Sequence, residues 1–338
     1  MPDVSVVMPV FNGEDHVAEA IESILQQDLE DFEFIIVDDG SQDTTPQILA
    51  DYARRDDRIR IVTQANGGVT RALLSGIAEA RGRYVARMDA DDLSMPDRLR
   101  KQVALLLARP ELVAVTCHIE HFGADGRTIR VEVPEHDPRL LPLLCCFFNR
   151  VGGGGQIMFD RAAYDAVGGF DPEFRVSEDY DLWTRMFTRG DFGVVEEVLY
   201  RYRTGHESIS SRNKELQIAL STRVSRREYE RLTGEPMDEK TARALIYFWW
   251  ARKPETTPMT DTIAASRAMH RAIDCFFRKN PQLAAMEAGL RRTVMANWRW
   301  RIPLAGKFNL TRRGLLLAHA LAWWVSAAAR LGNGTRSN

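Results

Sequence analysis

The chain has 338 residues, 45% hydrophobic and 27% charged, which is enough for one large domain with an appendage or for two domains. This composition excludes a disordered or low-complexity protein. The net charge is only −2, and no nucleic-acid partner is expected. The four cysteines lack the paired spacing of a zinc site, and the first residues resemble a strand rather than a signal peptide. Both features favour a cytoplasmic protein.

The first hundred residues alternate short apolar runs with segments of helical period. The runs are β-branched or aromatic, as expected for buried strands, and they lie at Val4–Val10, Phe34–Val37, Ile59–Val62 and Tyr84–Ala86. Between them, one helix is predicted from the apolar stripe of Val17–Leu25, and another starts at Thr45–Pro46. Strands joined by helical crossovers predict an α/β fold with a Rossmann-like, mostly parallel sheet flanked by helices.

Beyond Pro96 the pattern changes twice. A helix is predicted over Arg98–Arg109 and a fifth strand over Leu112–Thr116, followed by a mixed, turn-rich section. From Lys214 onward helical patterns dominate. We therefore place a domain boundary near residue 211, with an α/β domain over residues 1–211 and a helical region over residues 212–338.

The end of the chain is strongly basic. From Leu290 to the last residue there are nine Lys or Arg and no Asp or Glu. The apolar run Leu315–Ala329 is shorter than the roughly 20 residues that span a bilayer. Two interpretations remain open. Residues 290–331 make a peripheral contact with the cytoplasmic face of a membrane, or they contain a core helix with a solvated basic side.

Polar residues follow each of the first four predicted strands. Asn12 follows the first strand, Asp39 the second, Asn66 the third, and Asp89 with Asp91 the fourth. In open parallel sheets ligands bind where the strands end, so these side chains are expected to share one crevice.

The acids after the fourth strand suit a metal ion. Asp89 and Asp91 provide oxygen ligands at positions i and i+2, which Mg²⁺ or Mn²⁺ accepts together with substrate phosphates. The alternative is a solvated acidic turn that caps the helix starting near Pro96, with Ser94 and Asp97 as the cap residues. A second acidic group, Glu178 and Asp179, opens a predicted helix and could supply a general base or only cap that helix.

Six segments, in this order and spacing, resemble the family 2 glycosyltransferases, inverting GT-A-fold enzymes that use nucleotide-sugar donors. The segments are "VSVVMPVFNGEDHVAEAIESILQQ", "FEFIIVDDGSQDTT", "GRYVARMDADDLSMPDRL", "VGGFDPEF", "SEDYDLWTR" and "LYRYRTGHESIS". Any one of these matches is weak, but the ordered set is highly specific. It extends over nearly all of residues 4–210 and implies a GT-A fold.

The resemblance implies roles for individual residues on the nucleotide side. The residues expected to contact the nucleotide sugar are Pro9, Val10, Asn12, Asp39, Arg71, Asp89, Gly168 and Gly169. Among them, Asp39 would accept a hydrogen bond from a uracil-like base and Asp89 would lie nearer the ribose. Arg71 is included because Leu74 stands where many family members have Asn.

The resemblance also implies the metal ligands and the base. Asp89 and Asp91 resemble the acids of the family's DXD motif, with Asp91 as the more direct ligand. Asp179 resembles the catalytic base, with Glu178 beside it. His206 resembles a histidine that reaches the metal or diphosphate in some members, and a structural role is the alternative.

The leading hypothesis is therefore an inverting, metal-assisted hexosyltransferase. It would move a sugar from a UDP-type donor to a hydroxyl of a glycan or lipid-linked acceptor, in cell-surface polysaccharide synthesis. One alternative is a nucleotidyltransferase, although "PVFNGEDH" lacks a basic, glycine-rich phosphate loop. The other is a catalytically silent sugar-nucleotide-binding subunit of a membrane complex.

Overall fold

The computed structural model describes residues 3–134, 137–205, 213–249 and 259–304. Contacts divide the chain into two units, Met1–Pro142 with Asn149–Leu220, and Leu143–Phe148 with Ser221–Asn338. The predicted domain boundary at residue 211 falls in a segment outside the described residues and stays a prediction. All four cysteines are buried.

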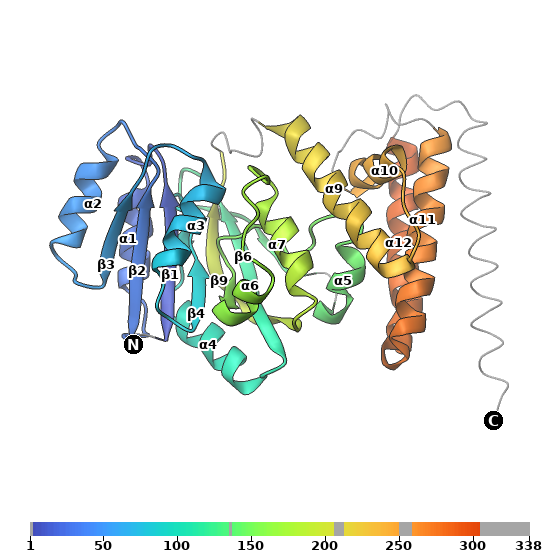
Figure 1. The fold of residues 1–338 in the computed structure, drawn as a ribbon, viewed down its shortest axis with the longest axis horizontal. Helices are drawn as coiled ribbons and strands as arrows, with labels where there is room; N and C mark the ends of the chain where they lie inside the picture. The colour runs from blue at the N-terminus through green and yellow to red at the C-terminus, as the bar shows by residue number, and fades with distance from the viewer. Residues whose placement is uncertain (1–2, 135–136, 206–212, 250–258, 305–338) are drawn as a thin grey trace. The chain divides into compact units, whose positions relative to one another are not determined.

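The first unit is built on a single mixed sheet (Figure 1). Its strands are β1 (Val4–Val10), β2 (Phe32–Asp38), β3 (Ile59–Thr63), β4 (Tyr84–Arg87), β5 (Leu93–Ser94), β6 (Leu112–Phe122), β7 (Thr128–Glu132), β8 (Met158–Asp160) and β9 (Asp191–Arg203). The order is β3-β2-β1-β4-β8-β6-β9-β5, with β7 paired to β6. β3, β2, β1 and β4 are parallel, whereas β8 runs antiparallel to both of its neighbours.

Helices cover both faces of this sheet. They are α1 (Val17–Leu25), α2 (Thr45–Ala53), α3 (Val69–Glu79), α4 (Arg98–Ala108), α6 (Arg161–Ala166) and α7 (Glu178–Met186). The short elements η1 (Pro138–Leu140) and α5 (Leu141–Leu144) follow β7. The predicted α/β fold with a mostly parallel sheet flanked by helices is confirmed, and the predicted strands lie within β1, β2, β3, β4 and β6.

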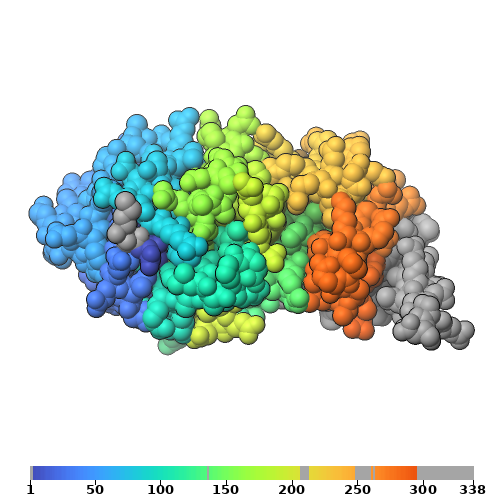
Figure 2. All heavy atoms as spheres, turned by 60° about the horizontal axis from the view of Figure 1, so that its bottom comes forward, coloured from blue at the N-terminus to red at the C-terminus, as the bar shows by residue number. Residues whose placement is uncertain are grey.

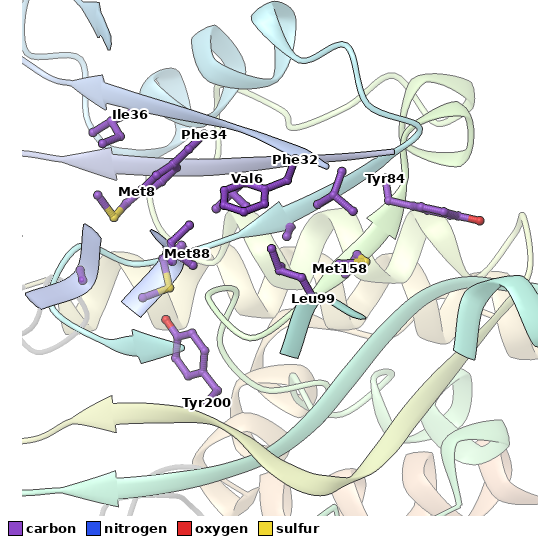
Figure 3. Packing of buried hydrophobic residues seen from close by; sticks show 14 of the residues in the cluster. Val6, Met8, Phe32, Phe34, Ile36, Tyr84, Met88, Leu99, Met158 and Tyr200 are labelled. Atoms are coloured by element: carbon purple, nitrogen blue, oxygen red, sulfur yellow. The ribbon is translucent and has the colours of Figure 1, made fainter. Parts of the chain in front are cut away.

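Strands β1 and β2 are buried on both faces, which explains their nearly continuous apolar sequences. Successive side chains point to opposite faces of a strand. Val6, Met8 and Phe34 therefore join a core cluster with α1 and α4, in which Met88 and Tyr200 also pack (Figure 3). The other face of β1 and β2 lies against α3.

The second unit is helical, as expected for the C-terminal region. Its helices are the part of α9 (Lys214–Thr233) from Ser221 onward, α10 (Glu239–Trp249), α11 (Met259–Lys279) and α12 (Ala284–Leu304), with η3 (Pro281–Leu283) between the last two. No helix among the described residues is both long enough and apolar enough to cross a bilayer. The run Leu315–Ala329 lies outside the described residues, so its two interpretations stay open.

Candidate active site

The loops after β1 and β2 are tied together by side chains. The Asn12 N–H donates to Ser41 Oγ at 2.9 Å, and Asn12 Oδ1 accepts from the Gln42 N–H at 2.8 Å. Asn12 also has a φ of 49°, which is uncommon outside glycine. Its side chain therefore fixes the shape of this strand end. Of its predicted neighbours, Val10 is buried and Pro9 partly buried.

Asp39 holds the loop between β3 and α3. Its Oδ1 accepts from Gln64 Nε2 at 2.7 Å and from the Gly67 N–H at 2.9 Å, and its Oδ2 accepts from the Gly68 N–H at 2.8 Å. Asp39 is only 3% exposed. Because a carboxylate oxygen accepts more than one hydrogen bond, Oδ2 keeps capacity for a ligand donor. Arg71, in the first turn of α3, is exposed and lies over Gly67.

Arg87, the last residue of β4, lies between two acidic segments. Its Nη1 is 3.1 Å from Glu178 Oε1, and its Nη2 is 3.2 Å from Asp89 Oδ1. The sequence separation between Arg87 and Glu178 is 91 residues. The structure thus brings the acids after β4 and the acids that open α7 to one guanidinium group. Burial opposes the charge on Arg87, but the nearby carboxylates outweigh it and raise its pKa.

The four residues Asp89 to Asp92 divide into two kinds. Asp89 and Asp91 are partly exposed, and Arg203 Nε donates to the Asp91 carbonyl at 2.8 Å. Asp92 is 1% exposed and accepts from the Tyr200 hydroxyl and the Arg203 N–H, both at 2.8 Å. Burial, with Asp89 and Asp91 nearby, raises the pKa of Asp92 well above its usual value. Asp92 therefore acts as a structural anchor that fixes the loop to β9.

The start of α7 is shaped by an unusual backbone. Ser177, its N-cap, has a φ of 59°, in the left-handed region. Glu178 is buried and Asp179 partly exposed. Asn149 Nδ2 donates to Asp179 Oδ2 at 3.1 Å and to the Gly152 carbonyl at 3.0 Å. Asp179, a partly exposed residue, therefore has a fixed carboxyl orientation.

The pKa of Asp179 is raised to about 7. Burial is the main cause, and the neighbouring Glu178 adds to it, whereas Arg87 opposes the shift. A carboxyl group with a pKa near the working pH can both accept a proton and release it. This is a property expected of a general base rather than of a simple helix cap.

Two glycines allow a neighbouring loop to close over these groups. A Cβ atom at Gly154 would lie 2.0 Å from Arg87 Nη1, and one at Gly155 would lie 2.0 Å from the Tyr200 hydroxyl. Any larger residue would displace these side chains. The loop backbone therefore packs directly on the ion pairs at the end of β4.

Arg98 is fully buried and joins the same two segments. Its Nη2 donates to the carbonyls of Arg87 at 2.7 Å and Gly155 at 2.8 Å, and the guanidinium lies over the Tyr200 ring at 5.0 Å. Its Nε donates to Gln102 Oε1 at 3.1 Å. The Arg98 side chain thus connects the end of β4 to the loop that contains Gly154 and Gly155.

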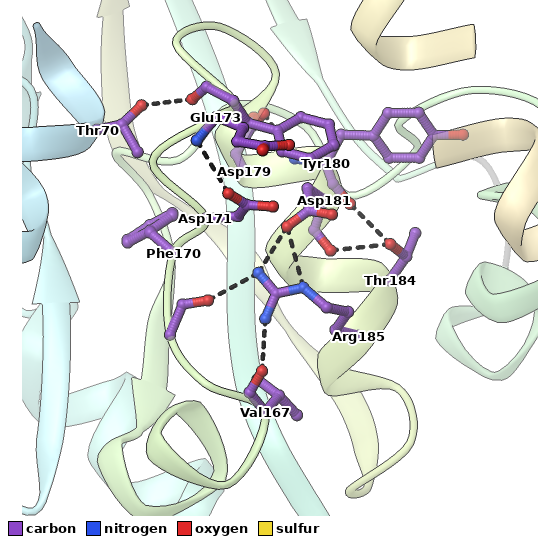
Figure 4. Close-up of polar contacts among 12 residues, drawn as sticks. Thr70, Val167, Phe170, Asp171, Glu173, Asp179, Tyr180, Asp181, Thr184 and Arg185 are labelled. Carbon is purple, nitrogen blue, oxygen red and sulfur yellow. Dashed lines mark hydrogen bonds and ion pairs between the residues drawn. The ribbon is translucent and has the colours of Figure 1, made fainter. Parts of the chain in front are cut away.

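Gly168 and Gly169 form the turn after α6, with φ values of +83° and +69°. Arg185 holds this turn, because its Nη2 donates to the Gly169 carbonyl at 2.7 Å and its Nη1 to the Val167 carbonyl at 2.8 Å. Asp181 pairs with Arg185 at 2.6 Å, two residues from Asp179 on the same helix (Figure 4). The turn is thereby linked to α7, and its contact with a sugar stays a prediction.

A second hydrogen bond joins the segment before α7 to α3. Thr70 Oγ1 donates to the Phe174 carbonyl at 2.6 Å. In the space-filling view, atoms of the first hundred residues and of the green segment after β8 adjoin on one face of the first unit (Figure 2). Residues far apart in the chain thus form one surface.

The described part of the chain contains no cluster of three or more His, Cys, Asp or Glu side chains that could hold a metal ion. Asp89 and Asp91 fit an ion that takes most of its ligands from a diphosphate, as Mg²⁺ does. His206 lies outside the described residues, so its assignment as a ligand stays a prediction.

Sequence analysis did not identify Arg87, Asn149, Arg98 or Tyr200. The sequence signal for Arg87 is a charged residue directly after the apolar run of a predicted strand. In the structure, every residue of β4 is buried, Arg87 included. A buried charge needs a partner of opposite charge, but no local pattern indicates that this partner is Glu178.

Comparison with known proteins agrees with this fold. Residues 5–168 match the model of "Glycosyl transferase family 2". EpsE of Bacillus subtilis (strain 168), named as a glycosyltransferase, is 36% identical over 220 residues, covering 63% of this chain and 77% of EpsE. TuaG of the same organism, named for teichuronic acid biosynthesis, is 33% identical over 233 residues, covering 68% of this chain and 90% of TuaG.

Two solved structures share the fold at low identity. S. aureus TarS 1-349 in complex with UDP-GlcNAc has a TM-score of 0.59 and 18% identity, covering 81% of each chain. The mannosyltransferase PcManGT from Pyrobaculum calidifontis, in complex with GDP-Man and Mn²⁺, has a TM-score of 0.52 and 19% identity, covering 95% of this chain and 86% of PcManGT.

Fold and sequence together define a glycosyltransferase with a GT-A-type α/β domain. The chain belongs to glycosyltransferase family 2, and the resemblance seen in its motifs is confirmed.

Proposed function

We propose that this glycosyltransferase moves a hexose from a UDP-type nucleotide sugar to a hydroxyl of a glycan or lipid-linked acceptor, with inversion. The observation that carries the proposal is Asp179, a partly exposed acid in the first turn of α7 whose carboxyl is oriented by Asn149 and whose pKa is raised to about 7. TarS with UDP-GlcNAc and PcManGT with GDP-Man support a nucleotide-sugar donor, and TuaG supports a place in cell-surface polysaccharide synthesis.

In this proposal Asp179 removes the proton from the acceptor hydroxyl as that oxygen attacks the sugar carbon. Direct attack by the acceptor gives inversion at that carbon. Asn149 keeps Asp179 Oδ2 oriented through its 3.1 Å hydrogen bond. Asp39 offers its remaining acceptor capacity to the base of the nucleotide, beside the exposed Arg71.

Asp89 and Asp91 would hold a divalent ion, Mg²⁺ or Mn²⁺, with His206 as a further candidate ligand. When bound, the ion supplies charge stabilisation for the departing diphosphate. PcManGT, which contains Mn²⁺ beside GDP-Man, supports a metal of this kind. Asp92 takes no part, because Tyr200 and Arg203 already engage its carboxylate.

The test is release of a nucleoside diphosphate from a panel of UDP- and GDP-sugars, with and without candidate acceptors. We expect release with a UDP-sugar, loss of release with a chelator, and recovery with Mg²⁺ or Mn²⁺. Asp91→Ala should abolish this recovery, whereas Asp97→Ala, an acid at the N-cap of α4, should keep it. Donor binding without any release would contradict the proposal and support a silent binding subunit.

A further inference from the structure

Arg87 makes contacts that a simple core ion pair does not require. Its side chain is 8% exposed and pairs with acids from two different segments, Glu178 at 3.1 Å and Asp89 at 3.2 Å. A buried ion pair repays its desolvation only with good geometry, so it is weak evidence for a role in stability. Two partners from the two acidic motifs are better explained by a need to fix the motifs relative to each other.

The surroundings of Arg87 restrict its position. Gly154 packs so closely that a Cβ atom there would lie 2.0 Å from Nη1 and 2.3 Å from Cζ. On the opposite side of the ion pair, Glu178 follows Ser177, whose left-handed backbone sets the direction of the chain into α7. The Arg87 guanidinium is therefore held in one position, between the loop that contains Gly154 and Gly155 and the start of α7.

We propose that Arg87 is a positioning residue that couples the donor-side acid Asp89 to the base Asp179 through Glu178. The proposal rests on the proposed function for the roles of Asp89 and Asp179. Since Glu178 and Asp179 are adjacent, the ion pair at Glu178 also sets where the Asp179 backbone lies. The base is then in place only when the loop after β4 is formed.

Five groups act on the Asp179 carboxyl. Glu178 and Asp89 are negative and disfavour its ionised form, whereas Arg87 favours the ionised form, as does the Tyr180 N–H at 2.7 Å. The Asn149 amide donates to Oδ2. Removal of the positive charge at position 87 should therefore make Asp179 harder to ionise.

The first experiment compares Arg87→Met with Arg83→Met. Arg83 lies just before β4, and its side chain is 63% exposed. Arg83→Met therefore removes one positive charge, as Arg87→Met does, but at a position outside the candidate site. We expect Arg87→Met to lower kcat roughly 100-fold with a smaller change in KM for the donor, because a misplaced base costs rate. The acidic limb of its pH–rate profile should move up by about one pH unit. Arg83→Met should match the native chain.

The second experiment keeps the charge and moves it. Gly154→Ala forces the guanidinium away, whereas Gly153→Ala adds a methyl group to an exposed position with only Gln156 nearby at 3.8 Å. We expect a loss of kcat in Gly154→Ala and not in Gly153→Ala. Arg87→Lys should recover part of the kcat lost in Arg87→Met. If Arg87→Met does not fold, Gly154→Ala against Gly153→Ala decides the question.

A measurement without donor separates this proposal from the proposed function. The pKa of the Asp179 carboxyl is followed by ¹³C NMR, with the signal assigned by its loss in Asp179→Asn. A higher pKa of the Asp179 carboxyl in Arg87→Met than in Arg83→Met supports the coupling even if no nucleotide sugar is turned over. Absence of turnover would contradict only the proposed function. Equal carboxyl pKa values, or equal kcat and acidic limbs in a folded Arg87→Met and its control, would overturn the coupling.

Discussion

Asp39 and Asp179 are both acids of the candidate site, but they are held in different ways. Asp39 is buried and accepts from two backbone N–H groups and one amide of the adjacent loop. Asp179 is partly exposed and is affected by the charges of Arg87 and Glu178. The proposed nucleotide side, at Asp39, is therefore fixed by hydrogen bonds from neutral groups, whereas charges set the ionisation of the proposed base, Asp179. Changes on the first side should alter donor affinity, and changes on the second side should alter the rate and its pH dependence.

The largest effect is expected for Asp179→Asn, which removes the base and keeps the shape of the side chain. We expect kcat to fall about 10²- to 10⁴-fold, the usual contribution of a general base, with donor affinity retained. Steady-state release of nucleoside diphosphate and donor titration by calorimetry measure the two quantities. A loss of affinity as large as the loss of rate would contradict the division between the two sides.

Asp39→Ala should give the opposite pattern. It leaves Gln64 Nε2 and the N–H groups of Gly67 and Gly68 without their acceptor. Because water can reach part of this loop and replace some of the lost hydrogen bonds, we expect the free energy of unfolding to fall by about 2 kcal/mol. Donor affinity should fall with it, while the acidic limb of the pH–rate profile stays in place. Chemical denaturation and donor titration check this result, and a shifted limb would show that the two sides are not separate.

The stability of the base side should depend on pH with a defined sign. The folded-state pKa of Asp179, about 7, lies above the value near 3.9 of an unfolded Asp. Its contribution to stability is therefore complete below about pH 4 and is lost as the pH rises towards 7. At pH 8 the free energy of unfolding of Asp179→Asn should exceed that of the native chain by about 1–2 kcal/mol after allowing for solvent exposure, so the variant should unfold at a higher temperature. At pH 4 the variant should lose this advantage. Equal differences at both pH values would argue against the raised pKa.

The smallest effect is expected for Tyr200→Phe. It removes the hydroxyl that donates to Asp92 and accepts from the Asp89 N–H at 3.3 Å, at a cost of about 1 kcal/mol. Tyr202→Phe, two residues along β9, is the matched control. Thermal unfolding of Tyr200→Phe and Tyr202→Phe measures the difference in stability. Identical melting temperatures would show that the Tyr200 hydroxyl does not stabilise the loop after β4.

The sequence predicts the parallel half of the sheet well, because β1 to β4 are short, apolar and separated by clear helices. β5 and β8 are too short to show a period, at two and three residues. β9 contains the polar run Glu196–Glu197 and tyrosines, so its strand character depends on pairing with β6 rather than on local pattern. Such pairing is a tertiary effect that single-sequence patterns do not contain.

The candidate site shows the same division. Asp89, Asp91 and Asp179 are visible because acids after a strand or before an apolar helix form local patterns. Arg87 and Asn149 are not visible, because each acts on a residue far along the chain, 91 residues away for the Arg87–Glu178 pair and 30 for Asn149–Asp179. Local motifs thus predict the candidate reacting groups, whereas the groups that orient them become evident only in the folded structure.

The position of Arg98 has a consequence for the time course of synthesis. Its guanidinium is fully buried, and one of its two carbonyl partners, Gly155, is 57 residues further along the chain. A ribosome needs about 3–10 s to add that many residues. Until then Arg98 lacks an acceptor that its burial requires, and the group stays in water. The loop with Asp89 and Asp91 therefore takes its final form only after the glycine segment has been translated, however early β1 to β4 assemble.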